Sequence, residues 1–126
     1  MKKIYLPGLI LLQLSIVIGC AKPDRVAVFK SPDPELFYTV ETYNGQGAVV
    51  SDFTRVYAHL ERDGKTDKKL MLDGEYLIIG KVTWVSANEV NLCVSEGFTN
   101  SFRNQVTLSA GSLSKTVRTH LQENCR

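Results

Sequence analysis

The side chains best suited to chemistry are few: three cysteines, Cys20, Cys93 and Cys125, and two histidines, His59 and His120. Thiolates and imidazoles are ligands that suit zinc. Zinc sites usually show paired spacings such as C-x-x-C or H-x-x-x-H, and neither occurs in this chain. A zinc site built from Cys93, Cys125, His59 and His120 is therefore the weaker interpretation, and we predict no metal site.

The chain also lacks the common catalytic motifs: there is no G-x-S-x-G elbow, H-E-x-x-H, P-loop or G-x-G-x-x-G. Residues 44–47 are rich in glycine but lack the lysine and hydroxyl that hold nucleotide phosphates. Asp73 and Glu75 flank a glycine, which favours a turn over a pair of glycosidase carboxylates. His59 falls on the polar side of an alternating segment. We therefore expect no catalytic residues, and a hydrolase assembled from distant residues is the less favoured alternative.

The N-terminus has the layout of a secretory signal peptide. Lys2 and Lys3 precede an apolar run over residues 4–18. The run ends in Val17-Ile18-Gly19-Cys20, two branched residues and a small one before a cysteine. This motif resembles the lipobox of bacterial lipoproteins.

The resemblance implies that residues 1–19 are removed and that Cys20 becomes the first residue, with acyl chains such as palmitate on its thiol and amino group. Because each buried methylene contributes about 0.8 kcal/mol, several chains make the attachment nearly permanent. Ala21 stands where lipoproteins of the inner membrane tend to carry Asp, which implies the outer membrane, facing the periplasm, in a Gram-negative host. The alternatives are an uncleaved membrane anchor and a plain signal peptide.

Removal of the signal peptide changes the net charge. The full chain has 15 Lys and Arg against 13 Asp and Glu, and loss of Lys2 and Lys3 leaves 13 of each sign. A composition of 44% hydrophobic and 22% charged residues is that of an ordinary globular chain, and 126 residues hold one domain at most. Without a concentrated basic surface, binding to nucleic acid is not expected.

Two cysteines remain once Cys20 is acylated. In an exported domain they predict one disulfide, Cys93–Cys125. Such a bridge closes a loop of about 33 residues and stabilises the fold by roughly 3–4 kcal/mol. Free thiols are the alternative.

Prolines divide the mature chain into a tether and a domain. Residues 20–35 hold the acylated cysteine and three prolines and are expected to be a tether, although residues 26–29 also fit an edge strand. Residues 36–126 are expected to form the domain. Turns are predicted at Asp63-Gly64 and Asp73-Gly74. Period-two alternation predicts strands at residues 36–43, 54–61, 69–72, 76–85, 89–95 and 104–109.

The last segment changes its apolar spacing from two to four, at Leu113, Val117, Leu121 and Cys125. This stripe predicts a short amphipathic helix that lies over the side of the sheet bearing Cys93. The predicted fold is mainly β: an antiparallel β-sandwich or partly open barrel with one C-terminal amphipathic helix.

Residues 95–104 are predicted to form a loop that carries aromatic and arginine side chains, the types that anchor interfaces. The alternative is that both phenylalanines pack in the core. Residues 45–53 are a second candidate, which we favour as an edge strand. The candidate partner-binding residues are Phe98, Asn100, Phe102 and Arg103.

These observations predict a non-catalytic envelope lipoprotein that contacts the membrane through acylated Cys20 and binds a protein partner. Inhibitors and immunity proteins, exclusion lipoproteins and accessory lipoproteins of secretion machines share this size and location, which is an argument by association. A small-ligand carrier that uses a barrel interior is the alternative from another class, and a hydrolase is the third. No cofactor is expected.

Overall fold

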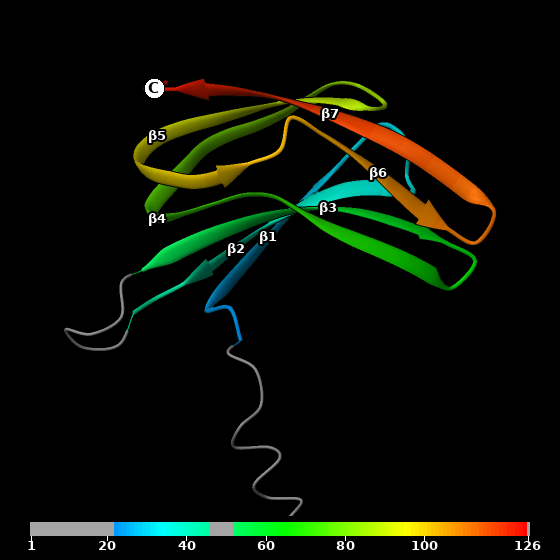
Figure 1. Cartoon of the computed structure of the whole chain (residues 1–126), viewed down its shortest axis with the longest axis horizontal. Helices are drawn as coiled ribbons and strands as arrows, with labels where there is room; N and C mark the ends of the chain where they lie inside the picture. The colour runs from blue at the N-terminus through cyan, green and yellow to red at the C-terminus, as the bar shows by residue number, and fades with distance from the viewer. Residues whose placement is uncertain (1–21, 46–51, 126) are drawn as a thin grey trace, which may run out of the picture.

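The computed structural model describes residues 22–45 and 52–125, and every regular element within them is a β-strand. The prediction of a mainly β fold is confirmed. The expected signal peptide at residues 1–19 and the expected lipidation site Cys20 lie outside the described residues. The strands in chain order are β1 (Arg25–Lys30), β2 (Leu36–Tyr43), β3 (Phe53–Arg62), β4 (Lys65–Ser86), β5 (Glu89–Phe102), β6 (Gln105–Ala110) and β7 (Leu113–Glu123) (Figure 1).

All seven strands belong to one sheet, in the order β1-β2-β3-β4-β5-β7-β6, and this sheet does not close on itself. Neighbouring strands are antiparallel except β5 and β7, which run parallel because β7 returns between β5 and the edge strand β6. The predicted turn at Asp63 and Gly64 joins β3 to β4. Both residues have positive φ, 51° and 78°, as a tight hairpin requires.

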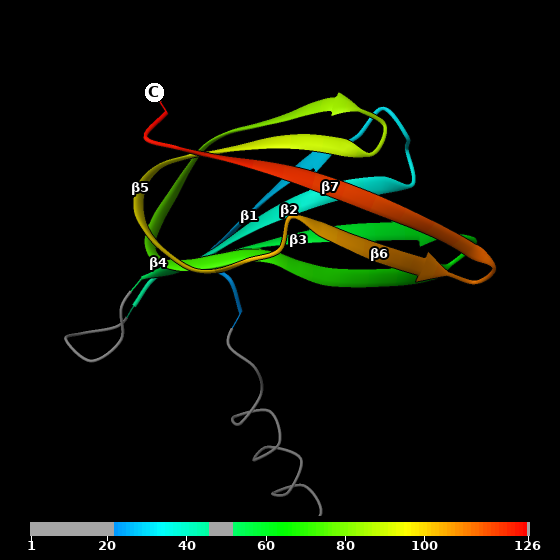
Figure 2. The ribbon, with the colours of Figure 1, turned by 45° about the horizontal axis from the view of Figure 1, so that its top comes forward.

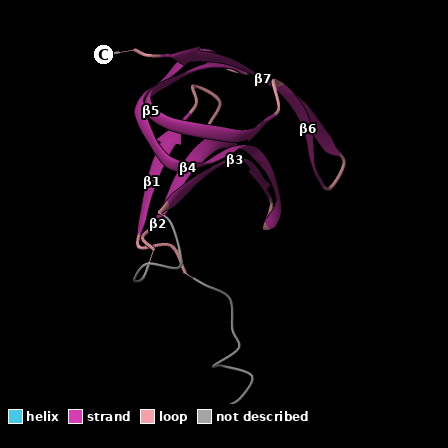
Figure 3. Cartoon of the chain, turned by 60° about the vertical axis from the view of Figure 1, so that its left-hand side comes forward, coloured by secondary structure: helices cyan, strands magenta, loops and turns pink. Residues whose placement is uncertain are grey.

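The sheet curls so that one of its faces lines the interior. Seen from the end of the molecule, β5 and β7 lie on one side and β1 to β3 on the other (Figure 3). The Tyr38 hydroxyl of β2 shares a hydrogen bond with the Thr119 hydroxyl of β7, and the Tyr38 ring meets Trp84 edge-on at 5.2 Å between centroids. The other buried core residues are Leu36, Val40, Val56, Ala58, Leu60, Met71, Leu72, Leu77, Val90, Leu92, Val94, Val106, Leu108, Ala110 and Val117.

Strand β4 serves both sides of the molecule because it is 22 residues long and bends near its middle (Figures 1 and 2). Its first part pairs with β3 and its second part with β5. At the bend, a Cβ on Gly74 would lie 2.0 Å from the Phe98 carbonyl oxygen, and a Cβ on Gly97 would lie 2.3 Å from the Tyr76 carbonyl oxygen. Only glycine permits so close an approach of the two backbones.

A gap separates β1 from the second half of β4, since β2 is the one described strand that pairs with β1. Polar contacts bridge one end of this gap. The Trp84 indole N–H donates to the Phe29 carbonyl oxygen at 3.1 Å, and the Ser31 hydroxyl donates to the Ala87 carbonyl oxygen at 3.2 Å. The other end, where β4 bends, stays open.

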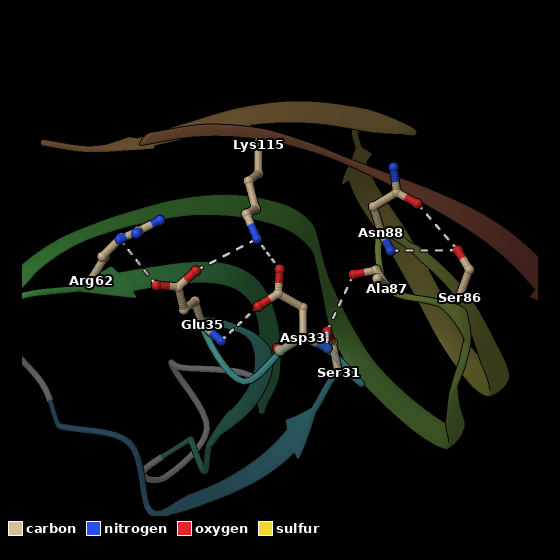
Figure 4. Close-up of polar contacts among 8 residues, drawn as sticks. All are labelled: Ser31, Asp33, Glu35, Arg62, Ser86, Ala87, Asn88 and Lys115. Atoms are coloured by element: carbon tan, nitrogen blue, oxygen red, sulfur yellow. Dashed lines mark hydrogen bonds and ion pairs between the residues drawn. The ribbon is translucent and has the colours of Figure 1, made fainter. Parts of the chain in front are cut away.

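Ion pairs hold β7 to the turn between β1 and β2 at the bridged end (Figure 4). The Lys115 ammonium hydrogen-bonds to the Asp33 carboxylate and lies 3.6 Å from Glu35 Oε1. Arg62 Nε of β3 lies 3.4 Å from Glu35 Oε2. The hydrogen bond between Lys115 and Asp33 raises the pKa of the ammonium and lowers the pKa of the carboxyl. Three separate parts of the sheet therefore meet at one charged cluster.

The expected C-terminal amphipathic helix is wrong, because residues 113–123 form strand β7. The spacing of four in Leu113, Val117 and Leu121 suits a strand as well as a helix, since four is a multiple of the strand period of two. With the strand period of two, Thr119 shares one side of the strand with Val117 and Leu121, and it is only 3% exposed. The β-branched residues Thr116, Val117 and Thr119 also favour a strand.

Three other boundaries differ from the expectations. Residues 95–104 are not a loop, because β5 continues through Phe102. The turn predicted at Asp73 and Gly74 is also wrong, since β4 runs through both residues and the glycine serves the close approach to β5. Within the expected tether, residues 25–30 form β1, in agreement with the alternative of an edge strand.

Cys93 on β5 and Cys125 after β7 lie at disulfide distance, with their Cα atoms 5.9 Å apart. The Cys125 amide also donates to the Val94 carbonyl oxygen at 3.4 Å. The cysteine pair therefore joins two adjacent parallel strands, β5 and β7, rather than a sheet and a helix.

The close approach at the bend makes a prediction. Gly97→Ala should lower the free energy of unfolding by about 3 kcal/mol or more, because its methyl group meets the β4 backbone in addition to the strain of a positive φ. Gly64→Ala is the matched control: its φ is also positive, but nothing lies within 4 Å of an added Cβ. Urea denaturation measures both, and equal losses in the two variants would show that the backbones are not in tight contact.

The charged cluster makes a second prediction. Lys115→Met should lower the free energy of unfolding by about 1–3 kcal/mol at neutral pH, because Asp33 loses its charged hydrogen-bond partner. Since the pKa of Asp33 is lowered in the fold, its stabilisation is present at neutral pH and is lost as the pH falls below about 4. Denaturant titrations should therefore show the difference between wild type and variant shrinking in acid. Lys81→Met, which replaces an exposed lysine, should show neither effect.

Candidate functional site

The side of β2 and β3 that faces away from the core carries aromatic and charged residues. Strand alternation sends Val56, Ala58 and Leu60 inward, where each is at most 1% exposed. The residues between them face outward and are half-buried. We call the following set the outer aromatic face: Phe37 and Tyr43 of β2, Phe53, Arg55, Tyr57 and His59 of β3, and Lys68 of β4.

His59 is fixed at one end of the outer aromatic face. Its ring stacks on Phe37, the cross-strand neighbour, at 4.5 Å between centroids and 6° between planes. His59 Nε2 shares a hydrogen bond of 2.7 Å with the Thr39 hydroxyl, and Tyr57 meets the imidazole edge-on at 6.3 Å. Burial, and then the nearby Lys68, lower the pKa of His59. The neutral imidazole is therefore the favoured form in this fold.

Arg55 lies over two stacked rings at the other end of the face. Tyr43 and Phe53 are cross-strand neighbours whose rings are 4.6 Å apart and 7° from parallel. The Arg55 guanidinium carbon lies 5.0 Å from the Phe53 centroid and 5.5 Å from the Tyr43 centroid. Both distances are within the range of a cation–π interaction. The guanidinium is thus held over the two rings while the side chain stays partly exposed.

Glu41 connects the two ends of the face. It is 8% exposed, accepts a 2.7 Å hydrogen bond from the Tyr43 hydroxyl, and lies 3.3 Å from the Lys68 ammonium. Lys68 also sits 4.0 Å above the Tyr57 ring. Burial, and then the Glu41 carboxylate, raise the pKa of Tyr43 to about 12, so its hydroxyl remains a donor at neutral pH. These contacts order the side chains before any partner arrives, which reduces the entropy lost on binding.

The composition of the face is unusual for its position. The outer side of an antiparallel sheet is normally polar when nothing covers it. No described strand packs on this side, yet it carries four aromatic rings and an imidazole. Val26 and Val28 of β1, 49% and 53% exposed, lie in the adjacent strand. Aromatic residues and arginine are the types that carry most of the binding energy in protein interfaces.

An apolar groove is the second notable feature. It follows the open end of the gap between β1 and β4 and has a volume of about 560 Å³, with Phe29, Val40 and Val82 among its lining residues. A second depression of about 470 Å³ adjoins it at the bend, and Leu77 and Ile78 line both. The volume of the groove falls in the range of small-molecule sites.

The four candidate residues predicted between 95 and 104 do not form one exposed loop. Phe98 is 72% exposed at the bend, where it lines the smaller depression. Asn100 and Arg103 are exposed. Phe102 pairs with Leu72 and packs against the core, as the alternative interpretation expected for it. The second candidate segment, residues 45–53, falls largely outside the description, because residues 46–51 are not described.

The histidines and cysteines are distributed over the sheet. His120 of β7 lies 2.9 Å from Glu89 of β5, whereas His59 belongs to the outer aromatic face. Within residues 22–45 and 52–125, no group of three or more His, Cys, Asp or Glu side chains is placed to hold a metal ion. The same residues include no helix with the length and apolarity needed to span a membrane.

The sequence carries a signal for the outer aromatic face. In residues 36–43 and 53–60, one parity holds most of the aliphatic residues, and aromatic residues recur on the other, at Phe37, Tyr43, Phe53 and Tyr57. In residues 54–61 the second parity was interpreted as a polar side because it also contains Arg55, His59 and Glu61. Aromatic side chains on both strands would have distinguished it from an ordinary polar side.

No family model, no curated protein and no solved structure matches the chain. Function must therefore be argued from the surface and from the N-terminal motif.

The lowered pKa of His59 makes a prediction about stability. The unfolded chain takes up a proton near the ordinary histidine value of about 6.5, before the folded protein does, so the free energy of unfolding should fall as the pH drops from about 7 to 5.5. His59→Gln should flatten this dependence. Urea titrations across this range measure the slope, with His120→Gln as the control that retains it. An unchanged slope in His59→Gln would contradict the assignment.

Proposed function

We propose that the protein is a non-catalytic, lipid-anchored protein of the bacterial cell envelope that binds another protein through the outer aromatic face. One observation carries the binding site: the outer side of β2 and β3 carries the half-buried rings of Phe37, Phe53 and Tyr57, with Arg55 beside them and Tyr43 buried beneath, where polar residues are the norm. The lipobox-like motif ending at Cys20 supports the anchor. Inhibitor or immunity proteins, exclusion lipoproteins and secretion accessories are the types this proposal covers.

The curled sheet suits such a role as a rigid support. We interpret it as the partly open barrel expected from the sequence, rather than a sandwich of two separate sheets, because all seven strands follow one hydrogen-bonded order. The core behind β3 is apolar, with Val56 and Leu60 fully buried. A partner on the outer side would therefore meet side chains carried by a strand that is paired on both sides and anchored in the core.

The groove favours a second candidate function, the binding of a small apolar ligand. Its volume of about 560 Å³ and its lining of Phe29, Val40 and Val82 suit an aliphatic molecule. The groove opens on one side, and the Thr54 hydroxyl at its wall already donates to the Leu77 carbonyl oxygen at 2.9 Å. Because the Thr54 hydroxyl already donates its hydrogen bond within the protein, it is less able to select a ligand. The groove therefore offers less specificity than the outer aromatic face.

Site-specific photo-crosslinking in the intact envelope tests the main proposal. A photoreactive phenylalanine analogue at Tyr57 should trap one protein, because Tyr57 lies at the centre of the face. The same analogue at Val85 should trap none of it, since Val85 is 58% exposed on the second half of β4. Absence of any specific adduct at position 57, or equal trapping at both positions, would contradict the proposal.

Binding of the trapped partner to purified variants then locates the site. Arg55→Ala should weaken the affinity tenfold or more, about 1.4 kcal/mol, as expected for a central arginine of an interface. Arg103→Ala is the matched control, an exposed arginine from the segment first predicted to bind. If Arg103→Ala weakens binding and Arg55→Ala does not, the partner uses the 95–104 segment and the outer aromatic face is not the site.

A further inference from the structure

We propose that the bend of β4 and β5 rests on the surface of the lipid bilayer that holds Cys20, with Tyr76, Ile78 and Phe98 as its contact residues. We call these three residues the bend tip. The inference relies on the lipid anchor of the proposed function and adds to it an orientation of the domain on the membrane.

The bend tip is an exposed apolar cluster. Phe98 is 72% exposed, Tyr76 57% and Ile78 49%, and all three line one depression together with Phe53. Tyr76 adopts a φ of 51°, a conformation that side chains other than glycine rarely take. Exposed apolar residues that are scattered singly need no explanation, but a contiguous group with an unusual backbone marks a contact surface.

The bend tip lies at the end of the molecule where the described chain begins. Arg25, the first residue of β1, lines the same groove as Ile78. Figures 1 and 2 show β1 starting at the end where β4 and β5 bend. The membrane attachment and the bend tip are therefore on the same end.

The connection to the anchor is short. Arg25 is paired with Thr42 in the sheet and comes only five residues after Cys20. Five fully extended residues reach about 17 Å at most. So short a link cannot hold the domain away from the bilayer, and it brings the nearest end of the domain, the one with the bend tip, to the lipid surface.

Charge at this end points to an apolar contact with lipid rather than to attraction by anionic head groups. Basic and acidic side chains there are nearly balanced, so the electrostatic term is small. Aromatic rings are well suited to the interfacial layer of a bilayer. The charged residues at this end are Lys22, Arg25, Lys81, Asp24, Asp52, Glu75 and Glu96.

Tryptophan quenching by brominated lipid tests the inference. Phe98→Trp adds a reporter at the bend tip, and Tyr76→Trp is a second one in case the first disturbs folding. Val85→Trp is the matched control, because it is equally apolar and exposed but lies near the hairpin at the far end of β4. The full lipidated proteins are reconstituted in phosphatidylcholine vesicles with and without brominated acyl chains, and Trp84 supplies the same background in all of them.

Emission from position 98 or 76 should be lost in brominated vesicles, while emission from position 85 is retained. Added salt should not restore the emission. Retained emission at both bend-tip positions, or equal loss at position 85, overturns the inference. A mass measurement of the mature N-terminus, made first, separates the two failures. If the mature chain carries no acyl groups, the proposed lipid anchor is wrong. If it is acylated but no quenching is seen, only the proposed docking of the bend tip is wrong.

Discussion

The close approach of β4 and β5 at Gly74 and Gly97 is the constraint on which the structure depends. A side chain at either position would meet the opposite backbone. Because both are glycines, β4 bends without leaving the sheet, and one strand pairs with β3 and then with β5. That bend brings the two halves of the sheet face to face, and the core packs between them. The same bend leaves Tyr76 and Phe98 in solvent.

The two ends of the molecule are held in different ways. Hydrogen bonds from Trp84 and Ser31 and the Lys115 ion pairs join separate strands at one end. At the other end the sheet stays open along an apolar groove. The outer aromatic face runs along β2 and β3 on the convex side, and its Phe53 also lines the depression at the open end.

Much of the architecture followed from the sequence, and the failures have physical causes. Alternation at residues 36–43 and 54–61 predicted β2 and β3, and Asp63 with Gly64 predicted the hairpin between β3 and β4. The helix at residues 113–123 was wrong because a spacing of four satisfies both periods. The turn at Asp73 was wrong because a glycine needed for close backbone approach has the same sequence signal as a turn glycine. The candidate site was missed because the charged residues on the outer side of β3 outweighed its recurring aromatic residues, and the stacking itself depends on strand register, which a single sequence does not reveal.

The position of β7 has a consequence for how the protein reaches its folded state. Among the described strands, β7 is the last to be synthesised, yet it lies between β5 and β6 in the sheet. Until it emerges, β5 keeps an unpaired edge beside Val90 and Leu92, and β6 has no neighbour with which to form its ladder. Such an edge is a template for wrong pairing with other chains. A chain that stops or stalls before residue 113 would therefore keep an open sheet edge along β5, which can pair with other chains until β7 is added.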